Sequence, residues 1–170
     1  MSKEVAGGRI LGPFSNPPLK NLQCNPIGIV PKKTPGKYRT IMDLSFPPGQ
    51  SVNDFINKDE FSLKYVTIDK AINQIQSLGH GCLLSKVDIA QAFRIIPVSP
   101  QCWNLLGIFW RNKYYIDTRL SMGGRSSPCL FDYLPTALEW ICVHNYNLKH
   151  MCHLLDDFLG VEAIQEQGNF

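Results

Sequence analysis

The spacing of apolar residues predicts a β-hairpin near the start of the chain. Residues 27–30 form a short apolar run, and residues 38–42 form a second run of strand-forming residues. The turn sequence Thr-Pro-Gly at 34–36 separates the two runs, which is typical of paired strands. Residues 1–25, in contrast, are rich in glycine, proline and asparagine and show no periodicity. We therefore expect them to form an extended arm that has no core of its own.

Apolar residues at three- and four-residue intervals predict two helices. The first covers residues 68–78, follows the capping residue Thr67 and ends before Gly79. The second begins at Pro128, since proline suits the first turn of a helix, and Pro135 should kink its interior.

The remaining apolar runs predict a mainly antiparallel sheet. Residues 82–88 form a compact run after a glycine, which predicts a buried strand. Residues 105–110 and 113–118 flank a two-residue turn, and residues 153–161 comprise two short runs that meet at an Asp-Asp pair. The order of hairpin, helix, strand, hairpin, helix and hairpin predicts an α+β fold.

Composition excludes several classes of protein. The chain has 170 residues, of which 44% are hydrophobic and 18% charged, so it can bury one sizeable core and is not disordered. No apolar run reaches the ~18 residues of a membrane span, and charged residues near the start leave no room for a secretory signal. We expect an intracellular protein, cytoplasmic or nuclear, that is neither secreted nor bound to a membrane.

The six cysteines do not form a Cys-x-x-Cys pair, so we expect buried thiols in a reducing compartment. Cys142-x-His144 and His150-x-Cys152 could in principle supply zinc ligands. Their neighbours are apolar, however, whereas zinc ligands usually lie at loop corners, and we favour a packing role.

Charge is distributed unevenly along the chain. Residues 1–40 contain seven basic residues and one acidic residue, whereas the other 130 residues contain ten basic and thirteen acidic ones. A basic segment beside an acidic remainder suits a polyanion held near a carboxylate-lined site. The alternative is a solvated basic tail without a function.

Three aspartates stand next to apolar runs. Asp88 ends the predicted strand 82–88, and Asp156 and Asp157 lie between Leu-Leu and Phe-Leu pairs. Carboxylates close to a core need a counter-charge, and few basic residues are near them in the sequence, so a divalent metal would satisfy them. Oxygen ligands favour Mg²⁺, which retains waters and binds phosphate oxygens. Alternatively, Asp156 and Asp157 serve only to form a turn, because aspartate tolerates left-handed backbone conformations.

Four segments of the sequence, in order, support the metal hypothesis. They are Pro31-Lys32-Lys33 with residues 36–45 and 47–54, Lys86-Val87-Asp88-Ile89-Ala90-Gln91-Ala92-Phe93, Leu120-Ser121-Met122-Gly123-Gly124-Arg125-Ser126-Ser127-Pro128, and Leu154-Leu155-Asp156-Asp157. Together they resemble the fingers and palm of reverse transcriptases, especially those of DIRS-like retrotransposons. The resemblance covers residues 26–163 and implies a reverse-transcriptase-like fold with a mainly antiparallel sheet packed on helices.

The resemblance also implies a role for individual residues. Asp88, Asp156 and Asp157 would be catalytic and would hold two Mg²⁺ ions, for which Mn²⁺ could substitute. Lys32 and Arg39 would bind the triphosphate, and Met122 and Gly123 would line the nucleotide pocket. Phe93 would pack against the sugar and exclude a 2′-hydroxyl; without the motif it would be a core aromatic.

The resemblance divides the chain into parts of one truncated domain. Residues 26–63 and 96–126 would be fingers-like, residues 64–95 and 127–170 would be palm-like, and residues 1–25 would be the basic arm. The family commonly has an aromatic at the position of Leu154 and different residues at Ser121 and Gly124. Only thirteen residues follow Asp157, too few for a thumb, a primer grip or an RNase H region. We therefore expect a fragment or a decayed copy of a retroelement protein.

Two functions are consistent with these motifs. The first is RNA-directed DNA polymerase, a nucleotidyltransferase whose partners are an RNA or DNA template with its primer and deoxynucleoside triphosphates. The second is a catalytically inactive remnant that binds nucleic acid through its basic arm and fingers. The packing account, in which Asp156-Asp157 is only a turn, predicts that Asn-Gly could replace the pair without loss of stability.

Overall fold

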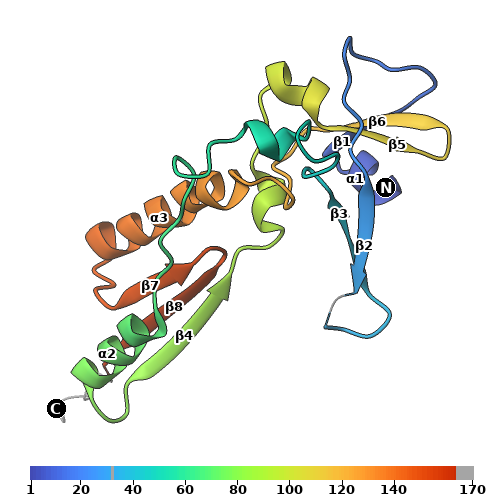
Figure 1. The fold of residues 1–170 in the computed structure, drawn as a ribbon. Helices are drawn as coiled ribbons and strands as arrows, with labels where there is room; N and C mark the ends of the chain where they lie inside the picture. Colours follow the sequence, from blue (N-terminus) through green and yellow to red (C-terminus); the bar gives the residue numbers. More distant parts are fainter. Residues whose placement is uncertain (32, 164–170) are drawn as a thin grey trace. The chain divides into compact units, whose positions relative to one another are not determined.

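The computed structural model describes residues 1–31 and 33–163, which form two compact units (Figure 1). Unit 1 comprises residues 1–62 and 91–130, and unit 2 comprises residues 63–90 together with residue 131 onward. The chain thus leaves unit 1 after residue 62 and returns to it at residue 91. The assignment of these parts to fingers and palm stays a prediction.

Unit 1 contains two small antiparallel sheets. Strands β1 (Ile10–Phe14), β6 (Lys113–Asp117) and β5 (Gly107–Trp110) form the first sheet in the order β1-β6-β5. Strands β2 (Ile27–Pro31) and β3 (Tyr38–Met42) form a separate two-stranded ribbon, in which Ile27 pairs with Met42. The hairpins predicted at 27–42 and 105–118 from apolar runs and turn residues are therefore confirmed. The buried apolar cluster of unit 1 consists of Ile10, Met42, Leu44, Leu106 and Ile108.

Short helical segments precede the first strand of unit 1 and lie between the later ones. They are α1 (Ser2–Ala6) and the 3-10 helices η1 (Val52–Phe55), η2 (Ala92–Ile95) and η3 (Pro100–Leu105). Their length explains why periodicity does not reveal them, since one turn of helix carries too few residues to repeat a pattern.

The expectation of an extended arm without a core over residues 1–25 is wrong. Residues 2–6 form α1, residues 10–14 form the edge strand β1, and Ile10 belongs to the buried cluster of unit 1. Pro13 argued against a strand in the sequence, because proline has no backbone N–H to donate to a neighbouring strand. It is tolerated here because β1 lies at the edge of its sheet.

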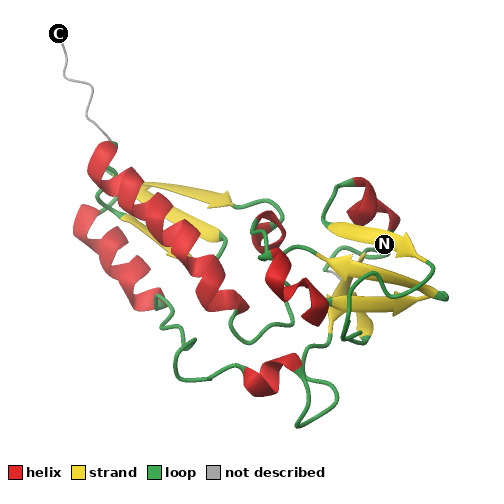
Figure 2. Cartoon of the chain, turned by 90° about the horizontal axis from the view of Figure 1, so that it is seen from above, coloured by secondary structure: helices red, strands yellow, loops and turns green. Residues whose placement is uncertain are grey.

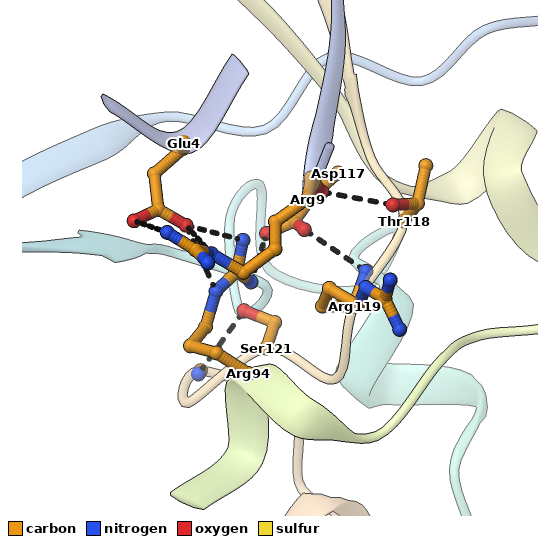
Figure 3. A network of polar contacts seen from close by, with 8 residues as sticks. Glu4, Arg9, Arg94, Asp117, Thr118, Arg119 and Ser121 are labelled. Atoms are coloured by element: carbon orange, nitrogen blue, oxygen red, sulfur yellow. Dashed lines mark hydrogen bonds and ion pairs between the residues drawn. The ribbon is translucent and has the colours of Figure 1, made fainter. Parts of the chain in front are cut away.

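A network of charged side chains fixes the N-terminal segment within unit 1 (Figure 3). The guanidinium of Arg9 donates from Nε to Oε2 of Glu4 at 2.9 Å, and Arg94 on η2 donates from Nη2 to the same oxygen at 3.1 Å. Arg94 also donates from Nη1 to Oδ2 of Asp117 at 2.7 Å. The hydrogen bond from Arg9 holds the pKa of Glu4 below its ordinary value, whereas burial raises the pKa of Asp117 in spite of Arg94.

The lowered pKa of Glu4 predicts a pH-dependent contribution to stability. Ionised Glu4 stabilises the fold above its ordinary pKa of 4.5, and this contribution is lost as the pH falls through the lower folded value. We expect Glu4→Gln to lower the free energy of unfolding by about 1 kcal/mol at neutral pH, allowing for solvent screening of a partly exposed network. Urea unfolding at several pH values should show this difference shrinking toward pH 3; a difference that is constant with pH would contradict it.

The described residues of unit 2 form a three-stranded antiparallel sheet and two helices. Strands β4 (Leu83–Asp88), β8 (Asp157–Glu162) and β7 (Met151–Leu154) form the sheet in the order β4-β8-β7. Helices α2 (Ile68–Leu78) and α3 (Ser127–Asn145), the latter mostly within unit 2, lie side by side (Figure 2), and Lys70 of α2 forms an ion pair with Glu139 of α3 at 3.5 Å.

Both predicted helices are confirmed. Thr67 is the N-cap of α2, and Gly79 ends that helix with a φ of 76°, which favours glycine. Helix α3 continues through the buried Pro135 as one element, so the proline does not end it. Neither helix, nor any other in the described residues, is long and apolar enough to cross a membrane.

The prediction of a buried strand at 82–88 is correct for the strand and wrong for its burial. All six residues of β4 are exposed, including Leu83, Leu84 and Val87. The reason is that β4 is an edge strand, which has a neighbour on only one side. Only Cys152 of the six cysteines is buried, so the expectation of buried thiols is wrong for the others.

Candidate functional site

The antiparallel pairing of β4 and β8 brings Asp88 next to the Asp156-Asp157 pair. Asp88, the last residue of β4, lies directly opposite Asp157, the first residue of β8. The next backbone N–H, that of Ile89, donates to the carbonyl oxygen of Asp156 at 2.9 Å. Directly opposed residues have Cβ atoms about 5 Å apart, so the carboxylates of Asp88 and Asp157 lie close together at one end of the sheet, next to the turn that contains Asp156.

The register of the strands also defines the face on which the carboxylates lie. His153 of β7 lies opposite Phe158 of β8, and its ring contacts Glu139 and Asp132 of α3. This face of the sheet is therefore turned toward α3. Because side chains alternate along a strand, Asp157 and its partner Asp88 lie on the opposite face, which is turned away from α3.

The carboxylates are accessible rather than buried. Asp88 is exposed, and Asp156 and Asp157 are half-buried. Lys86, two residues before Asp88 on the same face, places its Nζ 3.1 Å from Oδ1 of Asp157. The inference that burial and a lack of basic neighbours require a metal is therefore wrong, since an exposed carboxylate beside a lysine is already stable in water.

The donor set nevertheless suits Mg²⁺. Carboxylate oxygens are the ligands that Mg²⁺ prefers, and water and phosphate oxygens usually complete its octahedron. Within residues 1–31 and 33–163, no three His, Cys, Asp or Glu side chains are grouped closely enough to hold a metal ion among themselves. The aspartates could thus contribute a partial shell that a bound phosphate completes.

The turn between β7 and β8 is formed by Leu155 and Asp156, and Asp157 already belongs to β8. The sequence-based prediction placed the turn one residue too late. Leu155 adopts a left-handed φ of 53°, and neither aspartate is among the described residues with positive φ. Tolerance of left-handed backbone therefore does not explain the aspartates, and a strained leucine at this turn is the kind of outlier found at functional sites.

This geometry makes a test of the packing account possible. Replacing Asp156-Asp157 by Asn-Gly should lower the free energy of unfolding by about 1 kcal/mol, because the glycine would weaken strand β8 and leave Lys86 without its partner. The same dipeptide placed at 155–156, where the left-handed residue lies, should be tolerated better. Urea unfolding of both double variants compares them; the packing account requires the first to be at least as stable as wild type.

In unit 1, Met122 and Gly123 line a cavity of about 400 Å³. The other lining residues come from the β2–β3 ribbon and its flanks: Pro26, Ile27, Gly28, Ile41, Met42 and Asp43. A Cβ on Gly123 would overlap with the carbonyl oxygen of Met42, so only glycine fits at this crossing of two backbones.

The other predicted nucleotide-binding residues also lie in unit 1, apart from Lys32, which is outside the described residues. Arg39 is exposed on β3, opposite Val30. Phe93 on η2 is buried, with 8% of its surface exposed, as expected for the alternative of a core aromatic. Its role at the sugar stays a prediction.

Sequence reasoning missed two polar residues. Lys86 stands inside the first palm-like motif, and its ion pair with Asp157 follows only from strand register. Asn53 is a buried amide that binds several backbone segments of unit 1. The only signal for Asn53 was its place in the segment 47–54 that continues the fingers-like match.

No protein-family model matches this sequence, and no curated protein matches it. Solved structures do match. A crystal structure of a prototype foamy virus protease-reverse transcriptase mutant is 20% identical, with a TM-score of 0.66 over 95% of this chain and 19% of that chain. The foamy viral enzyme in complex with double-stranded DNA is 18% identical, with a TM-score of 0.62 over 94% of this chain and 24% of that one. The enzyme in complex with an RNA/DNA hybrid is 16% identical, with a TM-score of 0.62 over 95% and 19%.

These identities show likeness of fold. The chain spans about a fifth of the length of the first of these structures and about a quarter of the second. The mixture of helices with antiparallel sheets agrees with the α+β prediction. The chain therefore has a reverse-transcriptase-like fold.

Proposed function

We propose that this chain is an RNA-directed DNA polymerase domain of a retroelement of the DIRS-like retrotransposon type, and that it is part of a longer protein. The observation that carries the proposal is the cross-strand pairing of Asp88 with Asp157, with Asp156 held beside them by the N–H of Ile89. Two opposed carboxylates on an accessible sheet face, with a third aspartate in the adjoining turn, suit metal-assisted nucleotidyl transfer within a reverse-transcriptase-like fold.

The reaction would extend a primer on an RNA or DNA template. The 3′-oxygen of the primer forms a bond to the α-phosphorus of a deoxynucleoside triphosphate, the bond to pyrophosphate breaks, and the hydroxyl proton passes to solvent. Two Mg²⁺ ions, or Mn²⁺ in their place, would supply charge neutralisation and lower the pKa of the attacking hydroxyl. Asp88, Asp156 and Asp157 would hold these ions through their carboxylate oxygens.

The residues of unit 1 would bind the nucleotide. Arg39 is exposed and can fork two phosphate oxygens, and Lys32 would add a second positive charge. Met122 and Gly123 would form part of the nucleotide pocket through the cavity they line. Phe93 would select deoxynucleotides by contact with the sugar.

The second candidate, an inactive nucleic-acid-binding remnant, is favoured by the β2–β3 hairpin. Lys33, Lys37 and Arg39 are exposed on this hairpin, and so is Tyr38, with 65% of its surface accessible. Basic side chains around an exposed aromatic suit contact with phosphates and with a stacked base.

Isothermal titration separates the two candidates. The polymerase site predicts that deoxynucleoside triphosphate binds only with Mg²⁺ and that Asp88→Asn weakens this binding at least tenfold. The remnant predicts binding of nucleic acid that weakens with salt, needs no Mg²⁺ and is equal in Asp88→Asn. Wild-type protein that binds no triphosphate in the presence of Mg²⁺ would exclude the polymerase site.

A further inference from the structure

Asn53 connects the two walls of the cavity in unit 1. It lies on η1 and is 5% exposed. Its amide nitrogen donates to Oγ of Ser45 and to the carbonyl oxygen of Gly123, both at 2.9 Å. Its side-chain oxygen accepts the backbone N–H of Arg125 at 2.7 Å. Every polar group of this buried amide therefore has a partner, as a buried amide requires.

The backbone of Asn53 adds two bonds to the same structure. Its N–H donates to the carbonyl oxygen of Leu44 at 2.9 Å, and its carbonyl oxygen accepts Nη1 of Arg125 at 2.6 Å. One wall contains Asp43 and is held through Leu44 and Ser45, the two residues that follow it. The other wall, the loop 121–126, is held through Gly123 and Arg125. One residue thus fixes the separation of the two walls.

The distance between the two walls can change very little. Gly123 crosses the backbone of Met42 so closely that even a Cβ would overlap with the Met42 carbonyl. The loop also places Met122, which is 49% exposed, at the same cavity as residues of β2 and β3. A shift of the Gly123 carbonyl would therefore change the width of the cavity.

We propose that Asn53 is a positioning residue for the nucleotide: by holding the Gly123 carbonyl against the segment after β3, it sets the width of the pocket that Met122 and Gly123 line. The inference rests on the proposed function, because the cavity is a nucleotide pocket only if that function holds. Asn53 acts through Gly123 and does not touch the nucleotide.

Two variants separate positioning from general stability. Asn53→Asp keeps the size of the side chain and an oxygen for the N–H of Arg125, but it cannot donate to the Gly123 carbonyl. Ser45→Ala is the matched control: it removes the other bond of the same amide nitrogen, while the backbone bond to Leu44 and the bond to Gly123 both remain. Asn53→Ser, which retains one donor, is the milder variant if Asn53→Asp does not fold.

The experiment measures deoxynucleoside triphosphate affinity with Mg²⁺, the melting temperature, and the NMR signals of the Gly123 amide and the Met122 methyl group. We expect Asn53→Asp to move both signals and to weaken triphosphate binding about tenfold or more, with Asn53→Ser intermediate. Ser45→Ala should lower the melting temperature comparably and change affinity less than about twofold.

Two outcomes overturn the inference while the proposed function stands. One is triphosphate affinity that is unchanged in Asn53→Asp, or in Asn53→Ser, although Asp88→Asn still weakens binding at least tenfold. The other is a loss of triphosphate affinity in Ser45→Ala as large as in the Asn53 variants, in proportion to the fall in melting temperature of each variant. Wild-type protein without Asp88-dependent binding would instead overturn the proposed function, and the inference with it.

Discussion

Replacing Asp88 by asparagine is expected to lower Mg²⁺-dependent primer extension by about a thousandfold or more. The amide has the shape of the carboxylate but lacks the negative charge that would hold a metal ion beside the transferring phosphate. Because Asp88 is exposed and forms the end of an edge strand, its replacement should change the free energy of unfolding by less than about 0.5 kcal/mol. Extension of oligo(dT) on poly(rA) measures the activity.

The control for this variant is Asp59→Asn, which makes the same chemical change at another exposed aspartate. It should leave extension unchanged. Extension by Asp88→Asn at the wild-type rate would remove Asp88 from the catalytic site. If the two variants lose activity equally, the loss would reflect net charge rather than a local site.

Replacing Phe131 by alanine is expected to lower the free energy of unfolding by about 3–5 kcal/mol. Phe131 on α3 has 0% of its surface exposed, so its removal loses the transfer free energy of the ring and leaves a cavity. Because domains are stable by only about 5–15 kcal/mol, this is a large fraction of the total. Urea unfolding followed by circular dichroism measures the change.

Tyr133 provides the matched control on the same helix. It is 70% exposed, and Tyr133→Ala should change stability by less than about 0.5 kcal/mol. Equal losses in the two variants would mean that α3 does not bury the face that the structure assigns to it.

Local sequence signals predicted the elements that local forces determine. The hairpins at 27–42 and 105–118 combine short apolar runs with turn residues, and α2 has a capping residue and a terminal glycine. Residues 10–14 were missed because their strand pairs with residues about a hundred positions away, and no local pattern specifies such pairing. The exposure of β4 was missed because apolar composition does not distinguish an edge strand from a central one.

The candidate site was predicted in part. The family resemblance selected Asp88, Asp156 and Asp157, and the structure places them at one end of one sheet. The turn was predicted one residue too late. Turns are usually recognised by aspartate or glycine at the left-handed position, and here that position is occupied by Leu155. Asn53 and Lys86 were missed because their partners follow from long-range backbone packing and from strand register, respectively.

Paramagnetic broadening by Mn²⁺ locates the metal directly, in a chain of 170 residues that suits NMR. With Mn²⁺ and a deoxynucleoside triphosphate present, we predict that the amide signals of residues 87–89 and 155–158 broaden first and that Asp88→Asn removes this effect. Broadening centred on other carboxylates, such as Asp132 and Glu139, or unchanged by Asp88→Asn, would contradict a metal site built on Asp88 and the Asp156-Asp157 pair.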